Sequence, residues 1–124
     1  MRHGLKRNTL GRAKDQQKAL LRSLSRELII NGHIQTTLTK AKVLRPFIEK
    51  IITKAKKSLA ASDPAHKLHY IRLIRKDLAS DIVSSLLDRA KPLADRQGGY
   101  TRIIKTIKRR GDSTQMSIIQ ILDN

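Results

Sequence analysis

The sequence predicts an α+β fold, a single two-layer domain in which helices cover one face of a small mixed three-stranded sheet. Apolar residues recur every three to four positions in four segments, and three short segments are rich in β-branched residues. The order helix, strand, three helices, two strands favours a sheet and helices packed in two layers. A length of 124 residues suits one domain. We expect a flexible basic arm over residues 1–14 and one domain over residues 15–124.

The first predicted helix spans residues 15–30 and ends at Asn31-Gly32, because glycine commonly follows the last turn of a helix. Residues 33–37 are short and β-branched and predict a strand. Thr37 or Thr39 is a suitable cap for the helix that starts near Leu38. The apolar residues at helical spacing in the first helix are Leu20, Leu21, Leu24, Leu28 and Ile29.

The helix that starts near Leu38 is the longest, and its lysines occupy the face opposite its apolar stripe. Pro46 interrupts it, because proline removes the hydrogen bond to Lys42 and crowds that carbonyl. We therefore expect either a kink at Pro46 or a helix that begins only at Arg45. The apolar stripe consists of Ala41, Leu44, Phe47, Ile48, Ile51, Ile52, Ala55 and Leu59.

Asp63-Pro64 is a cap followed by a first-turn proline and opens a third helix, and Lys91-Pro92 closes a fourth that runs from about residue 78 to 90. Gly98-Gly99 marks a turn, after which residues 100–107 and 115–122 predict an antiparallel hairpin across Gly111-Asp112. The residues expected to point inward are Leu68, Ile71 and Ile74 in the third helix and Ile82, Val83, Leu86 and Leu87 in the fourth.

The chain carries 27 Lys and Arg against 10 Asp and Glu, a formal charge of +17, and the excess lies in three blocks nearly free of acid. These are residues 1–14, residues 40–57 with Glu49 as their one carboxylate, and residues 102–110. Such crowding of like charge opposes folding unless a partner of opposite sign compensates. Solubility alone needs a net charge of only about 2 to 8. Nucleic acid is the expected partner, because each neutralised phosphate releases counterions.

Several other classes are disfavoured by the composition. Without cysteine the chain has no disulfide or thiolate metal site, which fits a reducing compartment. Its strongly apolar runs reach three residues, whereas a membrane span needs about 20. Asp63, His66 and His69 are spaced for one helical face, but no second ligand cluster supports a metal site. We find no catalytic motif and expect neither an enzyme nor a cofactor.

Three places are candidate phosphate contacts. Thr36-Thr37 with Lys40 and Lys42 lie where a strand passes into a helix, so hydroxyls and free N–H groups converge there, although plain helix capping explains these threonines equally well. Gly98-Gly99, between Arg96 and Arg102, offers bare backbone, or else simply a turn. Residues 108–110 lie at the predicted hairpin tip. With three aromatic residues in the chain, base stacking contributes little and phosphates dominate.

A longer pattern joins these places. Residues 34–42 read Ile-Gln-Thr-Thr-Leu-Thr-Lys-Ala-Lys, and after six residues comes Glu-Lys-Ile-Ile-Thr-Lys-Ala-Lys at 49–56. With the opening Met1-Arg2-His3 and Gly98-Gly99-Tyr100-Thr101-Arg102-Ile103, this resembles the bacterial-type family of large-subunit ribosomal protein number seventeen. Pro46 departs from the family pattern and puts the straightness of the long helix in doubt.

The resemblance implies a non-catalytic constituent of the large ribosomal subunit that binds and stabilises its rRNA near the polypeptide exit tunnel. The implied partners are rRNA and neighbouring ribosomal proteins, with no membrane and no small-molecule substrate. The implied location is the cytoplasmic ribosome, or a plastid or mitochondrial ribosome if the source is a eukaryote. With the charge blocks, the candidate rRNA contacts are Arg2, His3, Lys6, Arg7, Arg12, Lys14, Thr36, Thr37, Lys40, Lys42, Lys56, Arg96, Gly98, Gly99, Tyr100, Arg102, Lys105, Lys108, Arg109 and Arg110.

Two rival functions remain open at this level. A compact DNA-binding protein would show the same charge, since charge does not distinguish the two nucleic acids. Alternatively, the basic helix over residues 40–57 would lie on an anionic membrane with its apolar stripe inserted. We favour the core of a folded domain as the role of that stripe over insertion into a membrane.

Overall fold

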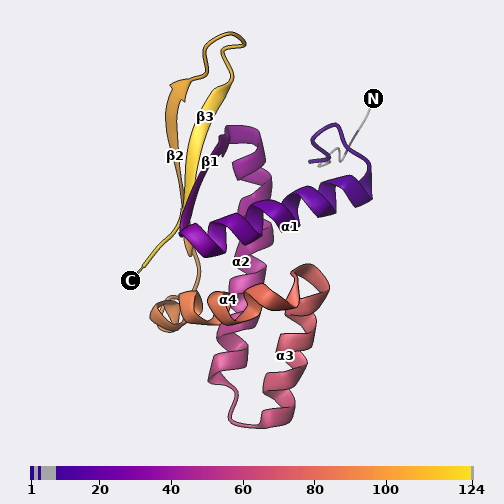
Figure 1. The fold of residues 1–124 in the computed structure, drawn as a ribbon, viewed down its shortest axis with the longest axis vertical. Helices are drawn as coiled ribbons and strands as arrows, with labels where there is room; N and C mark the ends of the chain where they lie inside the picture. The colour runs from indigo at the N-terminus through magenta and orange to yellow at the C-terminus, as the bar shows by residue number, and fades with distance from the viewer. Residues whose placement is uncertain (2, 4–7, 124) are drawn as a thin grey trace.

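A computed structural model describes residues 1, 3 and 8–123, and this part of the chain folds into four α-helices, two short 3₁₀ turns and three strands (Figure 1). The α+β class and the predicted order of elements are confirmed. In the basic arm, Arg2, Lys6 and Arg7 lie outside the described residues. The elements are α1 Lys14–Asn31, β1 His33–Thr37, α2 Leu38–Ala60, α3 Pro64–Asp77, η1 Ser80–Ile82, α4 Val83–Ala90, η2 Lys91–Leu93, β2 Thr101–Lys108 and β3 Gln115–Ile121.

The three strands form one sheet in the order β1-β3-β2, and both pairings are antiparallel. The expectation of a mixed sheet is therefore wrong. The hairpin makes β2 and β3 antiparallel, and β3 then inserts between β2 and β1 (Figure 1). β1 and β2 run in the same direction, but they never pair because β3 separates them.

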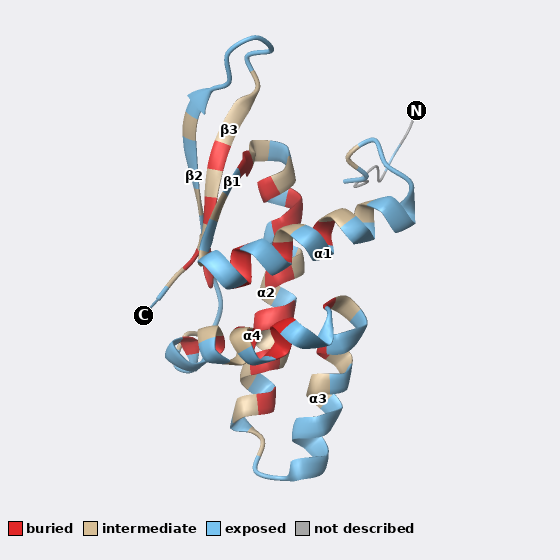
Figure 2. Ribbon diagram, in the orientation of Figure 1, coloured by how far each residue is buried: buried red, intermediate tan, exposed pale blue. Residues whose placement is uncertain are grey.

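α2 is the centre of the domain. The figures show the sheet beside its first half, α1 crossing it, and α3 running back along its second half (Figures 1 and 2). Buried residues follow the predicted apolar stripe of α2 and the sheet face turned toward it, so this stripe is the core of the domain. The largest fully buried side chains are Leu28, Ile29, Leu44, Ile48, Ile51, Ile52, Ile74, Leu86, Leu93, Ile119, Ser25 and Ser58.

Local signals set three helix ends as predicted. Gly32 follows α1 in the left-handed conformation with φ 80°, and its N–H donates to the Leu28 carbonyl, a geometry that glycine adopts without strain. The Thr37 hydroxyl accepts from the Lys40 N–H at 3.4 Å and caps α2. The Asp63 carboxylate accepts from the Ala65 N–H at 3.0 Å, and Pro64 occupies the first turn of α3.

One of the two alternatives at Pro46 is excluded, because α2 continues through Pro46 and does not begin at Arg45. Two other details of the prediction are wrong. Leu68 remains 43% exposed because it lies near the free end of α3. The fourth helix starts at Val83 rather than Leu78, since Leu78 is extended and buried and a 3₁₀ turn precedes the helix.

Replacing Pro46 by alanine is expected to stabilise the protein by about 2 kcal/mol. Proline inside a helix costs about 3 kcal/mol relative to alanine, partly offset because proline restricts the unfolded chain. Pro46 is exposed, so the exchange leaves no cavity. Urea unfolding of Pro46→Ala measures the gain, with Pro64→Ala as the control at a position that suits proline. An unchanged or lower urea midpoint for Pro46→Ala would contradict the expectation.

Candidate nucleic-acid interface

The junction between β1 and α2 presents the positive end of the longest helix. Thr37 caps it, Lys40 is half-buried and Lys42 is exposed. Thr36 is only 8% exposed, and its carbonyl accepts from the Ser117 hydroxyl at 3.3 Å. Capping by Thr37 is therefore confirmed. Thr36 is buried, so its side chain is poorly placed to contact a phosphate. The free N–H groups of the first turn and the two lysines are a suitable setting for one phosphate.

The hairpin tip carries the third basic block. Arg109 is engaged within the turn: its guanidinium donates to both carboxylate oxygens of Asp112, at 3.2 and 2.6 Å. Arg109, helped by the Thr114 N–H, holds the pKa of Asp112 well below its ordinary value. The contribution of this ion pair to folding stability is therefore complete at neutral pH. It is lost only as the pH falls through the lowered pKa of Asp112. Lys108 and Arg110 are exposed, and in the described part of the chain neither has a side-chain partner.

The fold brings the junction and the hairpin tip to the same end of the sheet (Figure 1). Thr37, the last residue of β1, lies opposite Met116, and the neighbouring Gln115 pairs with Lys108. The cations of residues 40–42 and 108–110, far apart in sequence, thus lie at the same end of the sheet. Such an end, with a helix terminus and a projecting basic turn, is suited to a polyanion backbone, whose phosphates proteins contact with Lys, Arg and helix N-termini.

The Gly98-Gly99 turn lies at the other end of the sheet, away from the hairpin tip. Thr101 pairs with Ile121, and the Leu122 N–H donates to the Tyr100 carbonyl at 2.8 Å. Gly99 has φ 62°, which a glycine accepts readily, and among the described residues no atom lies within 4 Å of the position of a Cβ. The two glycines are exposed, so a sugar-phosphate chain has free approach.

Lys56 and Tyr100 hold that turn from inside. The Lys56 ammonium donates to the Arg96 carbonyl and, at 3.1 Å, to the Tyr100 hydroxyl, and it lies 4.9 Å from the Tyr100 ring centroid. Tyr100 is only 4% exposed, so its ring has no face for a base. The geometry makes Lys56 a positioning residue for the turn over residues 96–100.

Other cations of residues 40–57 are also used within the domain. Lys54 pairs with Asp77 at 2.6 Å. Glu49, the one carboxylate of this block, lies 3.5 Å from Arg45 and accepts from the Thr101 hydroxyl at 2.8 Å, which joins α2 to the start of β2. The remaining candidates are placed at the surface: His3, Arg12, Lys14, Arg102 and Lys105 are exposed.

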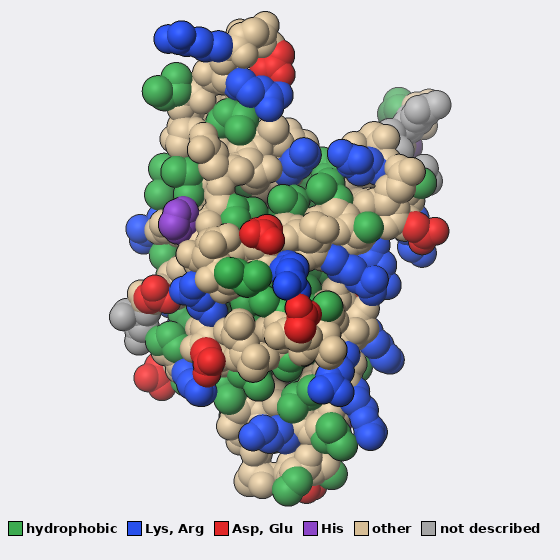
Figure 3. All heavy atoms as spheres, in the orientation of Figure 1, with side chains coloured by type: hydrophobic (Ala, Val, Ile, Leu, Met, Phe, Trp, Pro, Cys, Tyr) green, Lys and Arg blue, Asp and Glu red, His purple; other side chains and the backbone are tan. Residues whose placement is uncertain are grey.

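Sequence reasoning missed a further group of cations on α1 and α3. Along α1 they recur at every fourth position, which places them on one face. Figure 3 shows Lys and Arg side chains gathered along these two helices. They lie outside the acid-poor blocks because Asp15, Glu27 and Asp77 are nearby in sequence, and their spacing along each helix was the available signal. They are Lys18, Arg22, Arg26, Arg72, Arg75 and Lys76.

Replacing Lys56 by methionine is expected to cost about 1 to 3 kcal/mol, because the Arg96 carbonyl and the Tyr100 hydroxyl lose their donor. Hydrogen exchange should accelerate in residues 96–100. If RNA binding is measured as well, the slope of log affinity against log salt should stay unchanged, whereas loss of a direct phosphate contact lowers it by about 0.7 to 1. Tyr100→Phe, which removes one of the two acceptors, is the milder companion variant.

No three His, Asp, Glu or Cys side chains converge within residues 8–123. His66 lies 3.6 Å from Asp63, while His69 packs edge-on against Tyr70. None of the described helices is both long and apolar enough to cross a bilayer.

Comparison with known proteins decides the family. Residues 20–122 match the family described as ribosomal protein L17. The chain is 40% identical over 125 residues to large ribosomal subunit protein bL17 of Thermotoga maritima, covering 99% of this chain and 95% of that protein. The chain belongs to the ribosomal protein L17 family. The L17 match begins inside α1, so the family assignment rests on the folded domain.

Two further L17 relatives show the same extent of similarity. The bL17 protein of Fervidobacterium nodosum is 42% identical over 128 residues, covering 99% of this chain and 100% of the relative. That of Opitutus terrae is 42% identical over 125 residues, covering 98% of this chain and 73% of the relative. These pairwise matches take in the basic arm as well as the L17 domain.

Proposed function

We propose that this chain is a non-catalytic structural constituent of the large ribosomal subunit that binds and stabilises large-subunit rRNA. Membership of the L17 family supports the large-subunit assignment, since the relatives carry that name. The observation that supports rRNA binding is the shared end of the sheet, where the amino terminus of α2 and the hairpin tip carry cations from two distant blocks that have no side-chain partner within the described residues.

The binding surface has three parts in this proposal. One stretch of rRNA backbone binds to the junction and to the hairpin. The junction supplies Lys40 and Lys42, and the hairpin supplies Lys105, Lys108 and Arg110. The basic arm of residues 1–14 and the turn at Gly98-Gly99, with Arg102 beside it, provide further contacts. Thr36, Tyr100, Lys56 and Arg109 contribute by holding these parts in place, because their polar atoms are buried or engaged inside the domain.

The proposed setting is the rRNA near the polypeptide exit tunnel, in the cytoplasmic ribosome of a bacterium and beside other large-subunit proteins. This finer placement rests on the family resemblance. Exposed Ile104 and Ile107 on β2 add apolar surface that is suited to a neighbouring protein.

Sedimentation of a tagged chain from a gentle lysate tests the proposal. Comigration with the large subunit and with whole ribosomes, lost after ribonuclease treatment, is the expected result. Sedimentation near the top of the gradient, or with the nucleoid, would overturn the proposal and favour DNA binding. Affinity for duplex DNA and for rRNA fragments at matched salt separates the two nucleic acids.

A further inference from the structure

A cavity of about 320 Å³ lies between α1, the carboxyl end of α3 and the turn before α4. Three of its lining residues are arginines, and those of α1 lie 49 or more positions before that of α3 in the sequence. None of them belongs to the three acid-poor blocks. The lining residues are Arg22, Ser23, Arg26, Arg75, Leu78, Ala79 and Ile82.

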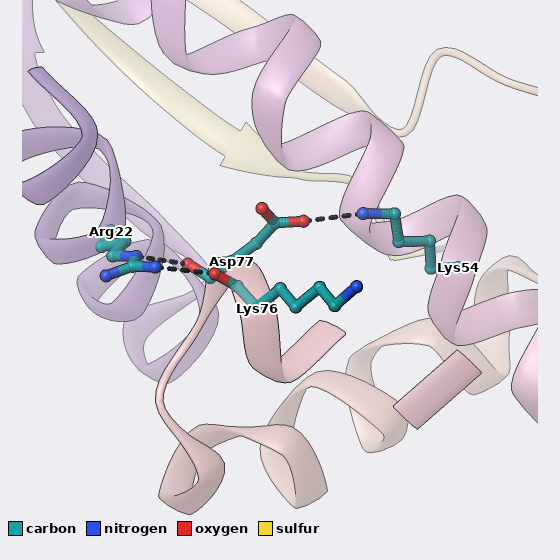
Figure 4. Close-up of polar contacts among 4 residues, drawn as sticks. All are labelled: Arg22, Lys54, Lys76 and Asp77. Carbon is teal, nitrogen blue, oxygen red and sulfur yellow. Dashed lines mark hydrogen bonds and ion pairs between the residues drawn. The ribbon is translucent and has the colours of Figure 1, made fainter. Parts of the chain in front are cut away.

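Arg22 is held in place by the end of α3. Its guanidinium donates to the carbonyl of Lys76 at 2.6 Å and to that of Asp77 at 3.1 Å (Figure 4). These are carbonyls of the last helical turn, where a cation is favoured. The Asp77 carboxylate in turn accepts from Lys54 of α2 at 2.6 Å. A guanidinium has five N–H donors, so three remain for a ligand in an already fixed orientation.

The carboxylates beside the cavity are already neutralised. Asp77 pairs with Lys54, and Asp81 pairs with Arg26 at 2.5 Å. Arg75 has no hydrogen-bond or ion-pair partner within the described residues. Arg22 and Arg75 therefore line one cavity with positive charge that no carboxylate of the described residues neutralises. Planar guanidinium groups match the geometry of phosphate oxygens and bind them through paired hydrogen bonds.

We infer that this cavity, called the arginine groove below, binds a backbone phosphate of a second large-subunit rRNA segment. The inference rests on the proposed function and extends it from one surface to two. Lys54, which joins the groove to α2 through Asp77, lies about 25 Å along the helix from Thr37, at about 1.5 Å rise per residue. The chain thereby holds two rRNA strands at separate places on a rigid domain.

Site-directed cleavage tests the groove, because the chain has no cysteine and a single one is labelled cleanly. Iron chelates are attached to Ser23→Cys at the groove, to Thr39→Cys at the β1–α2 junction, and to Ser85→Cys as control. Ser85 lies outside both proposed surfaces, in a separate cavity that Asp88, Arg89 and Asp123 also line. Each labelled protein is bound to deproteinised large-subunit rRNA. Cleavage from Ser23→Cys at nucleotides distinct from those cut from Thr39→Cys is expected.

The outcomes separate the groove from the proposed function. If the Thr39→Cys label cleaves while the Ser23→Cys label gives no more than the Ser85→Cys control, or cuts only the same nucleotides, the groove inference is overturned and rRNA binding stands. If no label cleaves, both fail.

A charge variant gives a second, independent readout. Arg75→Gln removes an unpaired groove cation, whereas Lys91→Gln removes an exposed cation that is paired with Asp88 on α4. We expect Arg75→Gln to weaken binding about fivefold at 0.1 M salt and to lower the salt slope by about 0.7 to 1. Lys91→Gln should change neither quantity. An unchanged slope for correctly folded Arg75→Gln would overturn the inference.

Discussion

Removing four cations from the junction and the hairpin tip is expected to weaken rRNA binding about 10³-fold at 0.1 M salt. The variant combines Lys40→Gln, Lys42→Gln, Lys108→Gln and Arg110→Gln. Each phosphate contact contributes roughly 0.7 to 0.9 to the slope of log affinity against log salt. With about eight contacts in all, the parent slope is near −7 and the variant slope near −3.5. Filter binding over a series of salt concentrations measures both values.

Two controls make this result specific. Exchanging the same positions as Lys40→Arg, Lys42→Arg, Lys108→Arg and Arg110→Lys keeps every charge and should retain most of the affinity. Lys67→Gln with Lys91→Gln removes cations from exposed positions outside the proposed surfaces and should leave the slope nearly unchanged. Phosphate binding at this end of the sheet would be contradicted if the affinity of the parent protein did not change with salt. It would also be contradicted if the quadruple variant had the same slope of log affinity against log salt as the parent.

Replacing Ile48 by alanine is expected to cost about 2 to 5 kcal/mol of unfolding free energy. Ile48 is fully buried on the side of α2 that meets the core, and removing its branched side chain leaves a cavity that the neighbours fill only in part. The total free energy of unfolding of a small domain is only about 5 to 15 kcal/mol, so this single change removes a large share of its stability. Urea unfolding followed by circular dichroism gives the difference.

Ile107→Ala is the matched control for this change. Ile107 is 89% exposed near the hairpin tip, so the same exchange should stay within about 0.5 kcal/mol. If Ile48→Ala cost as little as the control, the apolar stripe of α2 would be free for other surfaces, including an anionic membrane. Because the stripe is buried, we expect the intact protein not to float with liposomes.

Local chemistry explains why much of the fold was predictable. The caps at Gly32, Thr37 and Asp63 act within a few residues of their position, and the hairpin depends on the turn at Gly111-Asp112. The sheet order depends instead on which strands meet after the helices have packed. Nothing near residues 33–37 in the sequence indicates that their partner lies some 80 residues later.

The candidate site, like the fold, was predictable from the sequence only in part. The basic blocks and the motif of residues 34–42 marked the surfaces correctly as cationic, because charge is read directly from composition. Which cations are free was not predictable: Lys54 and Lys56 meet Asp77 and Arg96 only through the tertiary fold. Arg22 and Arg75 were missed for the same reason, since the groove exists only where α1 and α3 meet.

The central strand of the sheet is also the last element of the chain. β1 and β2 each pair with β3 and never with each other, so no strand pairing is complete until residues 115–121 have been synthesised. The helices all precede β2 and β3 in the chain and are free to pack earlier. The end of the sheet that gathers the junction and the hairpin tip is therefore assembled last. During its own synthesis the protein therefore acquires this cationic end of the sheet only when almost the whole chain is available.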